Sequence, residues 1–420
     1  MTWLPTLFAA EAIPSAIITF VALLMFLQLG VGWELSTLLC GLLTLPWVMK
    51  SWVRERVHHL GHLSVQLRVA ELLTFLLMVA LAFCFDGTAA SPWLVFASLF
   101  LLCVLSAWHE LVAQMFYKQR LRRVQQRFYS GLRMFFSQAA VVLTYGVMIV
   151  VVGSLEVFYY NYSQVIARSW SSAVYLLAGV YLLLLLYNVF SLKVSGAPAT
   201  SLTSLHPYRS LSRTSHLVLH VSLFLLLLPQ ALMFHTRVLF LMAPQTEGGL
   251  ATPLQWVGLA QGTVGVIAFS AGLILGHRFL HHPHLSPLTP HPSSLNPSMV
   301  LALGLSPAVD WLMTFYPPTN LLWLCVATAT AQFCFGYGFH ACAPILRALF
   351  GHRYEGTIHY LYIPLVTLLM LPAMAASGWL VARLGFARFF MIDALLALPA
   401  WGAAAYAFHH LSTLPVAHEK

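Results

Sequence analysis

Four acidic residues lie deep inside long apolar stretches of the sequence, where an ionisable side chain is costly and therefore points to function. They are Glu11, Glu110, Asp310 and Asp393. Glu110 follows His109 directly and lies four residues before Gln114, so Glu110 and Gln114 share one helical face. A carboxylate in a medium of low dielectric can take up and release a proton. We therefore predict proton coupling through Glu110, with Glu11 and His109 assisting.

Each of these acids also has a structural interpretation. Glu110 could pair with a nearby arginine such as Arg133. Glu11 lies just before Pro14, which removes a backbone donor and disturbs the helix, and Glu11 could serve as a cap. Asp310 and Asp393 have no recognisable surroundings, and we expect both to be structural.

The segment AQFCFGYGFHA (331–341) combines glycine with aromatic and polar residues. Aromatic faces suit sugar rings, and polar side chains supply hydrogen bonds to a solute. With Gln114, the predicted solute contacts here are Gln332, Phe335, Tyr337 and His340. The alternative is helix–helix packing with Gly336 and Gly338 at the contact.

A further candidate binding region follows Pro229. Gln230 comes directly after this proline and His235 about one turn later. The pattern predicts an interrupted helix at the start of the second half of the chain, where binding sites of transporters form. We add Gln230 and His235 to the predicted solute contacts.

Other kinds of site are not indicated. Two histidine groups, at 58–62 and 277–291, lack companion cysteines or carboxylates, and the six cysteines show no CxxC spacing. No GxxxxGK[ST] loop and no nucleophile–base pair occurs. We therefore expect no metal, no cofactor and no enzymatic activity, with a proton gradient as the energy source.

These residues must be positioned by membrane helices. Of 420 residues, 60% are hydrophobic and only 8% are charged, and the mean hydropathy of +0.81 excludes a water-soluble globule. Continuous apolar stretches without alternation argue against a β-barrel. We predict an all-α protein with twelve spanning helices, near 7–29, 33–53, 65–85, 91–117, 132–153, 171–192, 215–242, 254–276, 298–316, 320–344, 357–381 and 386–409.

The 21 basic residues indicate orientation. Most fall at or beside alternate loops, which places both termini and the longest linker in the cytoplasm. The exceptions are Arg168, Arg237, Arg383 and Arg388. The net charge of +9 thus follows from topology, and we expect no nucleic-acid partner. The Ser-, Thr- and Pro-rich linker 193–213 divides the chain into six-helix bundles at 1–192 and 214–420.

Several collinear strings resemble the AmpG-like (muropeptide permease-type) branch of the major facilitator superfamily, of the kind found in Bacteroides-type bacteria. They include EAIPSA (11–16), SAWHELVAQMFY (106–117), LPQALMFH (228–235) and AQFCFGYGFHA. The resemblance implies two pseudo-symmetric six-helix bundles that work by alternating access, and a monomer in the bacterial inner membrane. It also implies proton symport of muropeptides or amino sugars, with Glu110 and Glu11 at acidic family positions.

The leading hypothesis is therefore a proton-coupled transporter of a muropeptide, amino sugar or other saccharide in the lipid bilayer. This sequence differs from the family that it resembles at two acidic positions, where it has Gln114 and Gln230. Because an amide side chain cannot titrate, two alternatives stay open. One alternative is an uncoupled facilitator or an exporter on the same fold. Another is a membrane sensor or scaffold that transports nothing.

Overall fold

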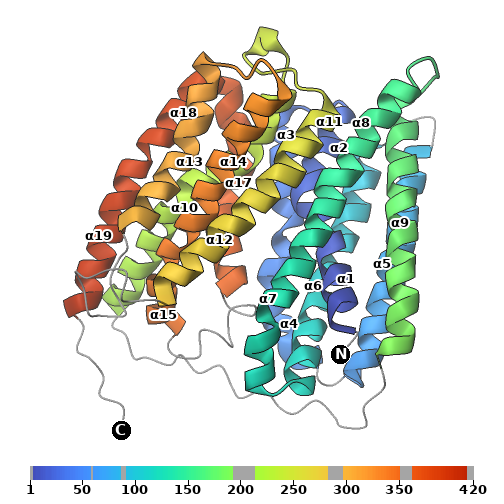
Figure 1. Cartoon of the computed structure of the whole chain (residues 1–420), viewed down its shortest axis with the longest axis horizontal. Coiled ribbons are helices and arrows are strands. Elements are labelled where there is room, and N and C mark those ends of the chain that lie inside the picture. Colours follow the sequence, from blue (N-terminus) through green and yellow to red (C-terminus); the bar gives the residue numbers. More distant parts are fainter. Residues whose placement is uncertain are drawn as a thin grey trace. The chain divides into compact units, whose positions relative to one another are not determined.

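The computed structural model describes residues 3–57, 60–86, 91–192, 213–281, 297–350 and 362–413. Every regular element in these ranges is a helix (Figure 1). The described residues include eleven helical stretches that are long and apolar enough to cross a membrane. The expected span at 33–53 is covered by two shorter helices, α3 (Trp33–Leu43) and α4 (Leu45–Val57), which meet at Thr44. The all-α membrane fold predicted from the sequence is confirmed.

The chain forms two compact units. The main helices of the first unit are α1 (Trp3–Ala16), α2 (Ala22–Gln28), α3, α4, α5 (Leu63–Asp86), α6 (Pro92–Arg120), α7 (Arg123–Val141), α8 (Met148–Phe158) and α9 (Val165–Ser191). The unit also includes Thr252–Thr263, which contains α11 (Leu254–Val257), and the start of α17 (Ile363–Leu384).

The second unit contains most of the remaining helices. They are α10 (Arg213–Met242), α12 (Val266–His281), α13 (Pro297–Phe315), α14 (Leu321–Gly338), α15 (Ala343–Phe350), the rest of α17 (Ile363–Leu384), α18 (Phe386–Leu395) and α19 (Ala397–Thr413). Residues 193–212 of the predicted linker lie outside the described residues.

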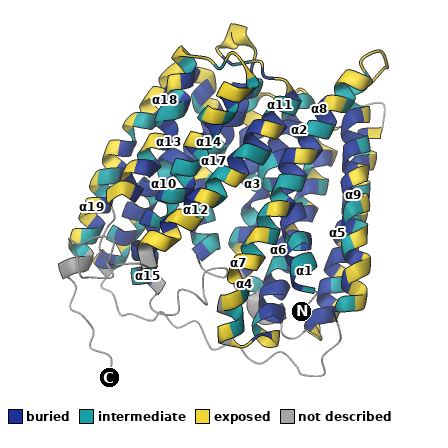
Figure 2. Cartoon of the chain, viewed as in Figure 1, coloured by how far each residue is buried: buried dark blue, intermediate teal, exposed yellow. Residues whose placement is uncertain are grey.

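Helix α1 forms the centre of the first unit. It packs against α6, α7 and α9, and its side chains Leu7, Phe8 and Ile13 are fully buried. A helix that is apolar on all sides gains most from such an interior position. The outer helices α5 and α9 instead carry exposed apolar side chains, among them Leu76, Phe83 and Leu183. Figure 2 colours exposed residues yellow. Such exposed apolar side chains suit contact with lipid.

Pro14 disturbs the first helix as its chemistry predicts. The helix continues after Ala16 as a π-helical turn, Ile17–Val21, before α2 begins. A proline inside a helix frees a carbonyl from its usual donor, and a wider turn is one way to absorb the change. Glu11 lies one turn before Pro14, so this irregular segment is next to a predicted functional residue.

Glycine brings α12 and α14 into close contact in the second unit. A Cβ atom added to Gly336 would lie 2.2 Å from the Phe269 carbonyl oxygen, and one added to Gly272 would lie 2.4 Å from the Phe333 carbonyl oxygen. Only glycine permits this approach. The packing alternative for the segment 331–341 therefore has a structural basis.

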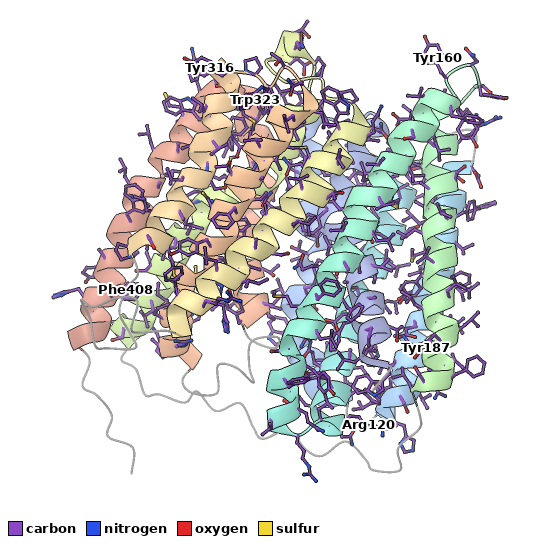
Figure 3. All side chains as sticks on the ribbon, in the orientation of Figure 1. Arg120, Tyr160, Tyr187, Tyr316, Trp323 and Phe408 are labelled. Atoms are coloured by element: carbon purple, nitrogen blue, oxygen red, sulfur yellow. The ribbon has the colours of Figure 1, made fainter. Side chains whose placement is uncertain are left out.

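The side chains at helix ends follow the pattern of membrane proteins. In the first unit Tyr160 lies where α8 leads toward α9, and Arg120 lies at the opposite end, where α6 stops (Figure 3). In the second unit Tyr316 and Trp323 lie near each other at one end. Tyrosine, tryptophan and arginine gather at membrane–water interfaces.

Candidate functional site

An ion pair between Lys50 and Glu110 lies inside the first unit. The Lys50 ammonium on α4 donates to the Glu110 carboxylate on α6 at 2.6 Å. The Lys50 side chain is 2% exposed and the Glu110 side chain 13% exposed. The structural alternative expected a cation such as Arg133 beside Glu110, and the ion pair that the structure shows is with Lys50. Lys50 ends the apolar string LPWVMK and counted among the basic residues at or beside alternate loops.

A second ion pair joins α1 to α7. The Arg133 guanidinium lies 3.7 Å from the Glu11 carboxylate and donates to the Gln114 side-chain oxygen at 2.8 Å. It also lies 4.4 Å from the centre of the Phe8 ring, a cation–π contact. These contacts hold the Arg133 side chain in one position against α1.

The two pairs form one charge cluster, which we define as Glu11, Lys50, Glu110, Gln114 and Arg133. Glu11 is within electrostatic range of Glu110 and Lys50 as well as of Arg133. One carboxylate oxygen of Glu11 and the side-chain nitrogen of Gln114 are buried without a hydrogen-bond partner among the described residues. The cluster therefore retains unused capacity to bind a polar group.

His109 binds a carboxylate outside this cluster, and it also lies within electrostatic range of Glu11. Its Nε2 lies 3.2 Å from the carboxylate of Glu71 on α5. Asn188 on α9 donates to the same carboxylate at 2.8 Å, and the Thr6 hydroxyl on α1 donates to Asn188 at 2.6 Å. Successive helical residues point about 100° apart, so the neighbours His109 and Glu110 reach different partners. Glu71, His109, Asn188 and Thr6 make up what we call the buried polar network.

Sequence reasoning missed most of this network. Glu71 and Asn188 are both fully buried. The available signal was Asn188 itself, a lone amide inside the apolar run LLLLLYNVF. A buried amide in a membrane helix needs a hydrogen-bond partner on another helix, but the sequence does not say which helix supplies it.

The predicted contacts near Pro229 lie in the second unit. Helix α10 continues through Pro229, so the expected interruption of the helix is wrong. Gln230 donates to the Leu303 carbonyl at 2.9 Å, and the His235 ring lies 3.5 Å from the Met374 carbonyl. Both side chains are buried and take part in packing between helices.

The aromatic segment of α14 also packs within the second unit. The Phe335 ring lies 5.2 Å from that of Phe269, and the Tyr337 hydroxyl lies 2.7 Å from the Ser298 hydroxyl. His340 lies just after α14, and its ring bonds the Leu273 carbonyl at 2.9 Å. All three are partly exposed, as is Gln332. Their role as solute contacts stays a prediction.

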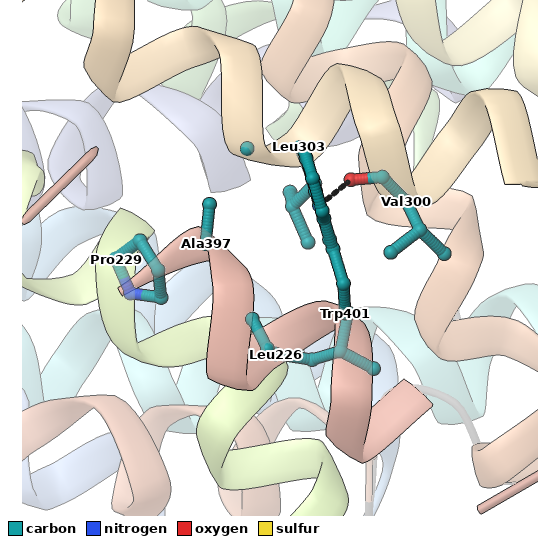
Figure 4. Close-up of a pocket in the computed structure, with 8 residues that line it drawn as sticks. Leu226, Pro229, Val300, Leu303, Ala397 and Trp401 are labelled. Atoms are coloured by element: carbon teal, nitrogen blue, oxygen red, sulfur yellow. Dashed lines mark hydrogen bonds between the residues drawn. The ribbon is translucent and has the colours of Figure 1, made fainter. Parts of the chain in front are cut away.

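A narrow crevice in the second unit is apolar. Figure 4 shows Leu226, Pro229, Val300, Leu303, Ala397 and Trp401 around it. The Trp401 ring nitrogen donates to the Val300 carbonyl at 2.9 Å. The crevice therefore offers no charged side chain to a solute, unlike the charge cluster of the first unit.

The histidine groups are only partly covered by the structure. His58, His59, His282, His284 and His291 lie outside the described residues. Within the described ranges no three His, Cys, Asp or Glu side chains gather as metal ligands.

Solved structures of membrane transporters resemble the whole chain. A bacterial homologue of the human lysosomal transporter Spinster, in an inward-facing and occupied conformation, matches with a TM-score of 0.68 and 13% identity over 99% of this chain and 98% of its own. A mutant of the nucleoside transporter NupG matches with a TM-score of 0.66 and 11% identity over 98% and 99%. A transporter of the POT family in complex with a peptide conjugate matches with a TM-score of 0.66 and 12% identity over 98% and 96%.

These likenesses establish the fold. The chain has the fold of these membrane transporters, the major facilitator fold. No family model and no curated protein matches the sequence.

Proposed function

We propose that this protein is a secondary transporter, not an enzyme, that moves a small solute across the bacterial inner membrane by alternating access. In this proposal it acts as a monomer with both termini in the cytoplasm. Three observations support it: the major facilitator fold over the whole chain, the similarity to solved transporters, and a charge cluster inside the first unit. The charge cluster is the observation that carries the proposal, because such groups in a membrane protein are costly to retain.

The proposed solute is a muropeptide, an amino sugar or another saccharide. The sequence resemblance to muropeptide permeases supports it, and so does a cluster that offers both cations and carboxylates. A thermal-shift screen of the purified protein against muropeptides, amino sugars, disaccharides, nucleosides and short peptides tests it. Nucleosides and peptides belong in the screen because two structural neighbours are described as their transporters. Stabilisation by nucleosides or peptides alone would reject the proposed solute class.

Proton coupling is proposed to act through the Lys50–Glu110 pair. A proton that binds the Glu110 carboxylate removes its negative charge and weakens the bond to Lys50. The Lys50 ammonium is then able to bind an acidic group of the solute, such as the carboxylate of a muropeptide. Release of the proton restores the pair and displaces the solute. Proton and solute binding are thereby linked through one cation.

Uptake into vesicles with and without a proton gradient tests this coupling. We expect the gradient to stimulate uptake by the native protein and not by Glu110→Gln, which keeps the shape of the side chain but cannot titrate. Glu34→Gln is the matched control, because Glu34 is exposed and lies outside the charge cluster. Transport that ignores the gradient in both the native protein and Glu110→Gln would reject coupling.

An uncoupled facilitator or exporter is the second candidate. The observation that favours it is the balance of the charge cluster, in which Glu110 has Lys50 and Glu11 has Arg133 as internal counter-ions. A carboxylate that is neutralised by a fixed cation has no need of a proton. Counterflow of labelled solute without any gradient, at a rate equal to gradient-driven uptake, would establish this candidate.

A further inference from the structure

An arginine and an aspartate form an ion pair in the interior of the second unit, and a second buried aspartate lies within electrostatic range of both. Arg237 on α10 binds Asp310 on α13 through both carboxylate oxygens, with Nε 2.9 Å from each. A guanidinium nitrogen of Arg237 also donates to the Ser306 hydroxyl at 3.3 Å. The side chain of Asp310 is fully buried and that of Arg237 is 6% exposed. Arg237, which the sequence placed toward the outer side, is thus an internal counter-ion.

Asp393 on α18 is the second aspartate and has no counter-ion of its own. Its side chain is 1% exposed, and both carboxylate oxygens are buried without a hydrogen-bond partner among the described residues. It nevertheless lies within electrostatic range of Asp310 and Arg237. The one cation within electrostatic range of Asp393 is therefore already bound by Asp310.

Among the described helices that pack on α18, Arg237 is the cation within electrostatic range of Asp393. Helix α18 packs against α10, α13 and α19. Helices α10 and α13 supply Arg237 and Asp310, and Arg388 on α18 itself is exposed. The titratable side chains of α19 begin at Tyr406, about 20 Å along the helix from Asp393. Two ionised aspartates beside one arginine would leave a net negative charge in the membrane interior, which costs several kcal/mol.

We propose that Asp393 holds a proton and that Asp393, Asp310 and Arg237 form a proton-binding site separate from the charge cluster of the first unit. Asp393 is the neutral carboxylic acid and Asp310 the carboxylate in the arrangement seen here. Because Asp393 lies within electrostatic range of Asp310 and Arg237, the charge on each aspartate depends on the other and on the arginine between α10 and α13.

The composition of the chain makes this site directly observable. The sequence contains only three aspartates, and the third, Asp86, is exposed at the end of α5. Protein grown with aspartate that carries ¹³C in its side-chain carboxyl group, and reconstituted in lipid vesicles, reports these three groups alone by infrared spectroscopy. The carbonyl band of a protonated acid is distinct from the bands of a carboxylate. This measurement requires neither a solute nor transport, so its outcome is independent of the proposed function.

At neutral pH we expect one ¹³C-shifted band of a protonated aspartate in the native protein. Asp393→Asn should abolish the band and Asp86→Asn should leave it unchanged. The proposal is overturned if the native protein shows no such band, or if the band persists in Asp393→Asn.

Asp310→Asn tests whether the three side chains form one site. In this variant Asp393 is the remaining aspartate within electrostatic range of Arg237, so we expect it to ionise, the protonated band to vanish and the protein to remain folded. The double variant Asp310→Asn/Asp393→Asn leaves Arg237 without either aspartate and should lose folded protein. The shared site is refuted if Asp310→Asn unfolds to the same extent as the double variant, or if it folds and keeps the protonated band.

Discussion

At the scale of single residues, the charge cluster shows how a sparse set of ionisable groups is held in a membrane protein. Each of its two carboxylates has a cation on a different helix. The pairing is specific, because Lys50 approaches Glu110 while Arg133 is engaged by Gln114 and Glu11. Removing one side chain of a pair should therefore destabilise the folded protein more than removing both side chains of that pair.

We predict that Lys50→Met destabilises the folded protein by about 1.5–3 kcal/mol, because it leaves a largely buried carboxylate without its donor. Glu110→Gln should also destabilise the folded protein. The double variant should lose less free energy of unfolding than the two single variants lose together. Reversible unfolding in detergent measures all three. Additive losses would mean that the two side chains do not interact.

The buried polar network leads to a second prediction at this scale. Asn188→Leu keeps the volume of the side chain but removes the donor to Glu71 and the acceptor of Thr6. We expect a loss of about 1–3 kcal/mol, since buried polar atoms are left unpaired. Phe190→Leu, two residues away and 82% exposed, is the control and should be nearly neutral. Equal thermal stability of the two variants would contradict the role of Asn188.

At the scale of elements, glycine decides how closely helices approach. The contact between α12 and α14 depends on Gly272 and Gly336, where an added Cβ would come within 2.4 Å of a facing carbonyl oxygen. The nearby aromatic side chains Phe335 and Tyr337 are positioned by this contact. Any solute-binding role of these rings therefore depends on the glycines behind them.

Gly336→Ala should consequently destabilise the protein by about 1–3 kcal/mol, because the added methyl group forces the helices apart. Gly402→Ala on α19 is a matched control, since no atom lies within 4 Å of its added Cβ. The control should be neutral or stabilising by about 0.5–1 kcal/mol, from better helix propensity. Comparing their thermal midpoints tests the packing; a neutral Gly336→Ala would disprove it.

At the scale of the whole molecule, orientation in the membrane follows from charge. Arg120 and Tyr160 lie at opposite ends of the first unit (Figure 3), and both are exposed. The end with Arg120 belongs to the basic loop between α6 and α7, which the positive-inside rule places in the cytoplasm.

We predict that a membrane-impermeant maleimide labels Tyr160→Cys on intact cells and labels Arg120→Cys only after the membrane is opened. The native protein is the control, because its cysteines are buried or half-buried within helices. Labelling of Arg120→Cys from outside, without labelling of Tyr160→Cys, would reverse the proposed orientation.

The sequence by itself determined the class of the protein and the position of its spans. Hydropathy is a property of some 20 consecutive residues, so a local window reports it without knowledge of neighbours. Candidate acids were found for the same reason, since a charge stands out in an apolar run. Pro14 and the glycines of 331–341 were also recognised locally, although α10 continues through Pro229 and the span at 33–53 is divided between α3 and α4.

Only the tertiary structure decided which groups meet. His109 and Glu110 are neighbours in sequence but bind Glu71 and Lys50 on different helices. Asp310 and Asp393 are 83 positions apart in the sequence, and both lie within electrostatic range of the same arginine. A partner depends on how each helix is rotated about its axis and on which helices lie beside it. Both are set by contacts between distant segments, which no local window of sequence contains.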